Sequence, residues 1–115
     1  LALGTNSSSM TAIGNDYGYE NVFAREIEAI ATPADILIAI TTSGNSGNIL
    51  KALESAKEAN VPAVVLTGAG RGMLDDATET LNVPSTDTAR IQECHILIGH
   101  IICGMAEASM FSNRN

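Results

Sequence analysis

The sequence is poor in aromatic residues and in positive charge. Aromatic side chains make up 3% of its 115 residues, tryptophan is absent, and 45% of the residues are hydrophobic. The core of this single modest domain must therefore be aliphatic. Only 6 lysines and arginines oppose 13 aspartates and glutamates, which gives a net charge of −7. This balance argues against nucleic acid as a direct ligand, although backbone N–H groups can still bind a local phosphate.

Long apolar runs and a disulfide are also lacking. The most apolar run, Ile96 to Cys103, is far shorter than the roughly 20 residues that span a bilayer. If their segment is helical, Cys94 and Cys103 lie about 13 Å apart along its axis, too far for a disulfide. Reduced thiols and the lack of a signal peptide predict a soluble cytoplasmic protein without a membrane partner. The first residue is not Met and reads as mid-strand, so we expect a further segment upstream.

Strands and helices are predicted to alternate along the chain, from apolar runs and from apolar residues at helical spacing. The expected strands are Leu1–Thr5, Asp35–Thr41, Ala63–Thr67 and Thr80–Val83. The expected helices are a short one that Ser7 or Ser8 caps and that ends near Asn15, then Glu20–Ala31, Gly47–Asn60 and Ala89–Phe111, with a helical turn at Met73–Ala77. This order predicts an α/β domain with a parallel sheet, whose ligands bind beyond the carboxyl ends of the strands.

The segment "TTSGNSG", residues 41–47, joins an expected strand to a helix at such an end. Its hydroxyl residues are Thr41, Thr42, Ser43 and Ser46. Its glycines let the backbone approach a ligand, and the first N–H groups of the helix favour an anion. Two interpretations stay open: a phosphate cradle, or a plain helix cap by Ser46. The spacing matches neither a Walker loop nor a dinucleotide-binding fingerprint.

The stretch "TTSGNSGNILKALESAKEANVPAVVLTG" resembles the sugar isomerase (SIS) domain, whose signature is a Ser/Thr-rich loop followed by Gly-Asn-Ser-Gly and a helix. "NDYGYENVFAREIEA" and "ARIQECHILIGHII" are similar to the phosphoheptose isomerase branch, which also contains the DnaA initiator-associating protein. The resemblance implies a doubly wound, flavodoxin-like α/β fold. Residues 1–115 would form the C-terminal two-thirds of one SIS domain, without the family's N-terminal helices and first strand.

The resemblance also implies a substrate site. Thr41, Thr42, Ser43 and Ser46 would hold the phosphate of a sugar phosphate, in agreement with the composition of the loop. Asp16 would line the active site. Its alternative role is that of a turn residue that hydrogen-bonds its own backbone.

His100 resembles the family's catalytic acid/base. Gln92 and His100 match residues that coordinate one zinc ion per subunit, together with a His and a Glu from the N-terminal part that this sequence lacks. The spacing alone is a weak metal signal, because residues i and i+8 differ by about 80° around a helix and about 12 Å along it. His95 lies on another face and is expected to be structural.

Two functions from different classes follow. By resemblance, the chain is an isomerase that converts sedoheptulose 7-phosphate to D-glycero-D-manno-heptose 7-phosphate through an enediol, a step toward ADP-heptose and the lipopolysaccharide core. The alternative is a non-catalytic SIS scaffold that binds the replication initiator DnaA. Ala89 stands where the isomerases carry an Asp, which favours the scaffold, whereas His100 and Gln92 favour the enzyme.

The expected C-terminal helix is apolar on almost every side. Its apolar residues include Ile91, Ile96, Leu97, Ile98, Ile101, Ile102, Met105 and Met110. A helix that is apolar all round must be buried on all sides, and one layer of sheet can cover only one. We therefore expect this helix to pack against copies of itself. The family resemblance likewise implies a homotetramer with active sites at subunit boundaries.

Overall fold

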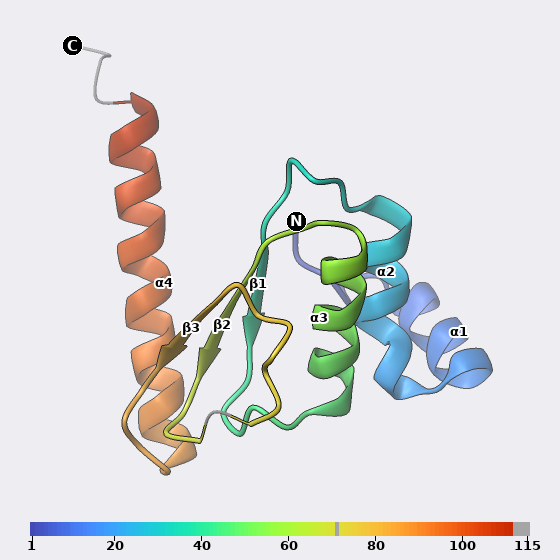
Figure 1. The fold of residues 1–115 in the computed structure, drawn as a ribbon, viewed down its shortest axis with the longest axis horizontal. Helices are drawn as coiled ribbons and strands as arrows, with labels where there is room; N and C mark the ends of the chain where they lie inside the picture. Colours follow the sequence, from blue (N-terminus) through green and yellow to red (C-terminus); the bar gives the residue numbers. More distant parts are fainter. Residues whose placement is uncertain (71, 112–115) are drawn as a thin grey trace.

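A computed structural model describes residues 1–70 and 72–111 of the chain. These residues form α1 (Ser7–Tyr17), the 3-10 helix η1 (Tyr19–Asn21), α2 (Val22–Ile30), β1 (Leu37–Ile40), α3 (Gly47–Glu58), β2 (Ala63–Thr67), β3 (Glu79–Asn82) and α4 (Thr88–Phe111). α3 lies on one face of the sheet and α4 on the other, while α1 and α2 lie beside α3 (Figure 1). The prediction of an α/β fold with helices on both faces is confirmed.

The described residues form one three-stranded parallel sheet in the order β1-β2-β3. Leu37 of β1 pairs with Ala63 of β2, and Val65 of β2 pairs with Thr80 of β3. Three of the expected strands are therefore confirmed, with small shifts at their ends. Because the strands are parallel, the loops that follow β1 and β2 both leave the sheet at its carboxyl end, where ligands bind in such folds.

The core lies around α3. On the sheet side, Leu53 belongs to a buried cluster with Ala39 and Val65. On the other side, Ala56 belongs to a second buried cluster with Ile27 of α2. These side chains are aliphatic, as the scarcity of aromatic residues requires. The amphipathic α3 thus fixes both the sheet and α2, and its first turn faces the loop that follows β1.

The predicted strand Leu1–Thr5 is wrong. The chain turns at Gly4, which has a φ of 72°, and a left-handed residue cannot continue an extended run. The Gly4 N–H donates to a Glu26 carboxylate oxygen of α2 at 2.6 Å. A Cβ at Gly4 would lie 3.0 Å from the Phe23 ring. This segment therefore packs on α2, and none of the described strands pairs with it.

Two local helix predictions also need correction. The cap of α1 is Asn6, in place of the expected Ser7 or Ser8, and its side chain accepts the N–H groups of Ser8 and Ser9. Asn and Ser are about equally good N-caps, so composition does not distinguish them. The segment Met73–Ala77 forms turns instead of the expected helical turn.

β1 lies at one edge of the described sheet, beside an apolar groove. The groove has a volume of about 670 Å³ and is lined by β1, α2 and residues 1–3. Ile36, Ile38 and Ile40 are 60%, 47% and 57% exposed. Unpaired edge strands with apolar side chains normally require a cover. The described residues leave this edge open.

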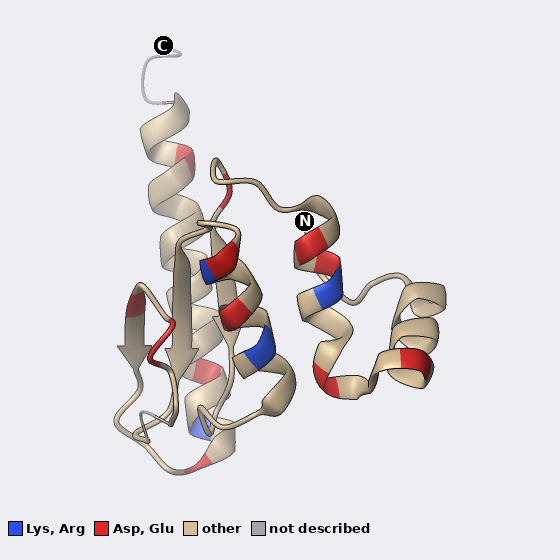
Figure 2. Cartoon of the chain, turned by 45° about the vertical axis from the view of Figure 1, so that its right-hand side comes forward, with Lys and Arg blue, Asp and Glu red and all other residues tan. Residues whose placement is uncertain are grey.

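α4 projects beyond the other elements and carries few charges (Figures 1 and 2). The radius of gyration is 15.2 Å, compared with about 13 Å for a compact domain of this length. Within α4, Ile91 and His95 are buried, whereas most of the apolar residues beyond them are exposed. The sequence prediction of burial on all sides is therefore not met within the single chain.

By length and composition alone, α4 is the one helix among the described residues that could cross a membrane. The apolar run Ile96–Cys103 is by itself too short to predict a membrane span. Gly99 and His100 interrupt this run, but the helix continues through both residues. The core helix of a soluble protein passes the same test of length and composition. The absence of a membrane partner stays a prediction.

Candidate functional site

The hydroxyl-rich loop of residues 41–47 leaves the carboxyl end of β1 and leads into α3. Thr41 is buried, and its N–H donates to the Leu66 carbonyl oxygen at 2.9 Å. Its hydroxyl accepts the N–H of Gly44 at 3.2 Å and lies 3.5 Å from the Ser46 hydroxyl. Gly44 has a φ of 73°, a conformation that glycine adopts without strain. Thr41 therefore holds the loop from the inside.

Ser46 is the N-cap residue of α3, but its side chain makes no capping hydrogen bond. The plain-cap interpretation is therefore wrong for this hydroxyl. Among the described residues, the backbone N–H groups of Ser43, Ser46 and Gly47 have no acceptor. These donors lie at the positive end of the α3 dipole, where an anion is stabilised. The loop thus offers unpaired donors to a negatively charged group.

The other hydroxyls of the loop differ in their surroundings. The Ser43 hydroxyl is exposed and accepts the N–H of Asn45 at 3.2 Å. Thr42 is half-buried, and its carbonyl oxygen accepts the N–H of Gly68 at 3.1 Å. Ser43 and Ser46 are thus the hydroxyl residues exposed at the mouth of the loop, whereas Thr41 and Thr42 support it.

A second glycine-rich loop, which follows β2, lies against the first. A Cβ added at Gly72 would be 2.1 Å from the Gly44 carbonyl oxygen, and one added at Gly68 would be 2.6 Å from the Thr42 carbonyl oxygen. No side chain fits at either position, so the two loops meet backbone to backbone. Sequence reasoning missed this contact. The available signal was the presence of glycine-rich segments after two neighbouring parallel strands.

Asp16 lies at the exposed C-terminal end of α1, where it accepts the Asn15 side-chain amide at 2.8 Å. The following η1 reaches the start of α3, since a Cβ added at Gly47 would lie 3.7 Å from the Glu20 Cβ. The described residues record no contact between Asp16 and the hydroxyl-rich loop. The structure therefore brings the segment of Asp16 near the loop but leaves the Asp16 side chain exposed.

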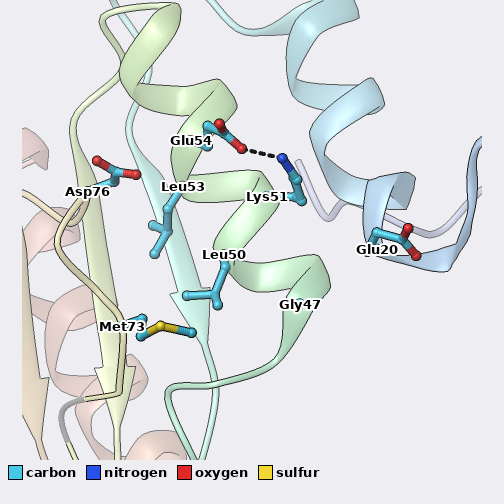
Figure 3. A pocket seen from close by; sticks show the side chains of 8 residues that line it. All are labelled: Glu20, Gly47, Leu50, Lys51, Leu53, Glu54, Met73 and Asp76. Carbon is cyan, nitrogen blue, oxygen red and sulfur yellow. Dashed lines mark hydrogen bonds and ion pairs between the residues drawn. The ribbon is translucent and has the colours of Figure 1, made fainter.

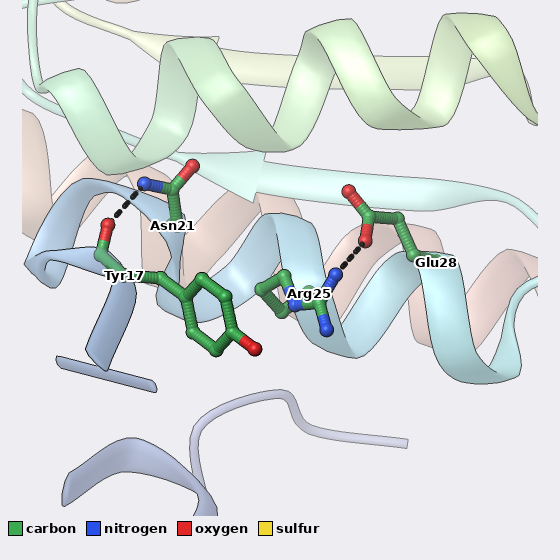
Figure 4. A network of polar contacts seen from close by, with 4 residues as sticks. All are labelled: Tyr17, Asn21, Arg25 and Glu28. Atoms are coloured by element: carbon green, nitrogen blue, oxygen red, sulfur yellow. Dashed lines mark hydrogen bonds and ion pairs between the residues drawn. The ribbon is translucent and has the colours of Figure 1, made fainter. Parts of the chain in front are cut away.

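A polar network fixes the turn that follows Asp16 (Figure 4). Asn21 Nδ2 donates to the Tyr17 carbonyl oxygen at 2.7 Å. The Arg25 guanidinium lies 4.7 Å from the centre of the Tyr17 ring and forms an ion pair with Glu28 at 3.0 Å. These contacts hold the end of α1 against α2, and with it the position of Asp16.

A separate hollow of about 410 Å³ lies beside α3 (Figure 3). Among the described residues, its lining has three carboxylates, from Glu20, Glu54 and Asp76, and one cation, Lys51. Asp76 also pairs with Lys57, outside this lining, at 2.6 Å. Lys51 donates to Glu54 at 2.6 Å, and this hydrogen bond raises the pKa of Lys51. Its charge is therefore already paired. An anion would meet net repulsion in this hollow, so we do not assign the sugar phosphate to it.

Gln92 and His100 are both exposed on α4. Their spacing separates them by about 12 Å along the helix. The described residues contain no group of three or more His, Cys, Asp and Glu side chains that could hold a metal ion. These residues alone do not fit a zinc ion. Zinc binding stays a prediction that requires ligands from outside the described chain.

Comparison with known proteins identifies the family. The family model described as "SIS domain" matches residues 1–68, more than half of the chain. The chain belongs to the SIS domain family. The hydroxyl-rich loop and the first turns of α3 lie within the matched part of this SIS domain.

Relatives of this SIS domain are about half identical to it. The phosphoheptose isomerase of Rhodospirillum rubrum is 47% identical over 97% of this chain and 60% of its own length. That of Aneurinibacillus thermoaerophilus is 52% identical over 99% of this chain and 58% of its own length. The solved structure of a phosphoheptose isomerase from Neisseria gonorrhoeae superposes with a TM-score of 0.86 at 45% identity, and the match covers 91% of this chain and 60% of that one. The chain thus spans less than two-thirds of the length of these relatives.

Proposed function

We propose that this chain is the phosphate-binding and proton-transferring part of a phosphoheptose isomerase. The observation that carries the proposal is the loop 41–47. The N–H groups of Ser43, Ser46 and Gly47 are unpaired near the start of α3, in a chain that is about half identical to phosphoheptose isomerases. The substrate is sedoheptulose 7-phosphate and the product is D-glycero-D-manno-heptose 7-phosphate, a precursor for the lipopolysaccharide core. We place the reaction in the cytoplasm.

The reaction moves a proton between two adjacent carbons through an enediol. The loop anchors the phosphate with backbone N–H groups and with the exposed hydroxyls of Ser43 and Ser46, so the sugar carbonyl lies at a fixed distance from it. His100 exchanges the proton, because an imidazole can act as a general acid or as a general base. A second acid/base group must come from outside the described residues. Asp16 orients the sugar from the side of α1.

Binding is tested by following backbone amide signals in protein at the full length of its relatives. We expect inorganic phosphate and sedoheptulose 7-phosphate to shift the amides from Ser43 to Gly47, because the N–H groups of Ser43, Ser46 and Gly47 then gain an acceptor. Unphosphorylated sedoheptulose is the control and should leave them unchanged. If the loop amides respond to none of these three compounds, or equally to all three, the loop does not bind phosphate specifically. It would then be only a structural connection between β1 and α3.

The same protein is expected to be a homotetramer. α4 exposes a stripe that contains Ile96, Leu97, Ile101 and Met105, which are 66%, 61%, 52% and 69% exposed. Burial of this apolar stripe between paired helices would stabilise the assembly by about 25 cal/mol per Å² of apolar surface. Light scattering at micromolar concentration should give four times the subunit mass. A clean monomer would contradict the assembly, and a species found only with detergent would favour a membrane partner for α4.

The scaffold that binds the replication initiator DnaA stays the alternative function. Ala89, one residue after the first residue of α4, is the feature that favours it. The relatives and the solved structure named above are all called phosphoheptose isomerases, and they give the scaffold no support. We therefore favour the enzyme.

A further inference from the structure

His95 is buried in α4, and one of its ring nitrogens lacks a partner. It is 4% exposed, and its Nε2 lies 3.2 Å from the Thr67 carbonyl oxygen. Because a carbonyl oxygen only accepts, Nε2 carries the hydrogen and donates. Nδ1 is then a buried acceptor with no donor among the described residues. An apolar side chain would fill this position without that cost. The imidazole is therefore explained by its bond to Thr67 better than by packing.

The bonded carbonyl belongs to the peptide that joins Thr67 to Gly68 at the carboxyl end of β2. The Thr67 carbonyl oxygen also accepts the N–H of Val83 at 2.9 Å, and Thr67 is fully buried. On the other side of the same peptide, the Gly68 N–H donates to the Thr42 carbonyl oxygen at 3.1 Å. One rigid peptide group thus bonds to α4 through His95 and to the hydroxyl-rich loop through Thr42.

The same junction has no free space. A Cβ added at Gly68 would lie 2.6 Å from Ile91 Cδ1 and 2.6 Å from the Thr42 carbonyl oxygen. Ile91 lies one turn before His95, so α4 touches the peptide through two successive turns. A shift of α4 along its axis would therefore have to move the Thr67–Gly68 peptide, and with it the loop.

We propose that His95 is a positioning residue. It fixes the position of α4 along its axis relative to the hydroxyl-rich loop, through the Thr67–Gly68 peptide. α4 carries Gln92 and His100, so this bond sets the distance between the phosphate anchor and the proton-transferring group. The consequence for catalysis rests on the proposed function. The mechanical coupling between α4 and the loop does not rest on it.

The test compares His95→Leu, which removes the donor, with His95→Gln, whose side-chain amide can donate from a similar position. The matched control is Ile27→Val, a buried change between α2 and α3, away from α4. Amide hydrogen exchange at Gly68 and Gly44 is measured in protein at the full length of its relatives, together with kcat and KM for sedoheptulose 7-phosphate. We expect His95→Leu to speed exchange at both amides and to lower kcat, each by roughly tenfold, the scale of one lost hydrogen bond.

His95→Gln should recover most of both losses, even where its melting temperature stays below that of the wild type. Ile27→Val should lower the melting temperature while kcat and loop exchange stay as in the wild type. Wild-type exchange in His95→Leu would overturn the proposal, and so would a Gln variant as impaired as the Leu variant, or equal effects of Ile27→Val. A wild type without turnover would refute the proposed function instead, and the exchange comparison, which needs no substrate, would still decide the coupling.

Discussion

Replacing His100 with Gln is expected to abolish isomerisation in protein at the full length of its relatives, while the assembly persists. General acid–base groups contribute about 10²–10⁴-fold to a rate, so kcat should fall by that factor. His100 is exposed in this chain, and an exposed substitution typically changes the free energy of unfolding by about 0.5 kcal/mol or less. The measurements are the rate of conversion of sedoheptulose 7-phosphate and the mass by light scattering.

Ser43→Ala is the matched comparison for His100→Gln. The Ser43 hydroxyl is exposed at the mouth of the loop and would contact phosphate in the ground state and the transition state alike. Its loss should therefore raise KM with little change in kcat. A His100→Gln variant with wild-type kcat would leave His100 without a catalytic role, and equal effects of the two substitutions on KM would place His100 in substrate binding.

Replacing Gly72 with Ala is expected to weaken phosphate binding by the loop. The new Cβ would lie 2.1 Å from the Gly44 carbonyl oxygen, and the φ of Gly72 is 54°, which an L side chain rarely adopts. The backbone of one loop must move away, and the N–H groups that we propose bind the phosphate move with it. Loss of one or two charge-assisted hydrogen bonds weakens binding by roughly tenfold or more. Calorimetric titration with inorganic phosphate measures this change.

Gly14→Ala is the control for Gly72→Ala. A Cβ at Gly14 meets no atom within 4 Å, and the residue lies inside α1. Alanine should stabilise this helix by about 0.5–1 kcal/mol and leave phosphate binding unchanged. If Gly72→Ala binds phosphate as tightly as the wild type, the backbone contact between the two loops has no part in the site.

Much of the fold could be predicted from local patterns. Ala63–Thr67 is a continuous apolar run, and β2 has the same bounds. α3 begins at Gly47, as its apolar periodicity and the glycine-rich turn predict. Leu1–Thr5 shows the limit of this reasoning, because its apolar residues fit either a strand or a packed turn. The packed turn is selected by the hydrogen bond between Gly4 and Glu26, which joins distant parts of the chain.

The site was predicted in outline only. The hydroxyls and glycines of residues 41–47 predict an anion-binding loop by composition, but they do not reveal that Thr41 faces inward or that the Ser46 side chain leaves the helix uncapped. The contact between Gly72 and Gly44 joins two loops after different strands, so no local pattern contains it. His95 is buried, as a structural residue should be, yet its bond to Thr67 gives it a further role. Each of these features depends on contacts that form only after the strands align.

The central claim is that this SIS domain belongs to an enzyme that interconverts two heptose phosphates. The most direct test is to incubate wild-type protein, at the full length of its relatives and supplied with zinc, with sedoheptulose 7-phosphate and to follow the aldoheptose phosphate by NMR. We predict steady formation of D-glycero-D-manno-heptose 7-phosphate, and none with His100→Gln. If the wild type forms no aldoheptose phosphate while it still binds the substrate, the proposed isomerase function is contradicted. Ala89 would then be the residue to restore to Asp, and the scaffold would be the better account.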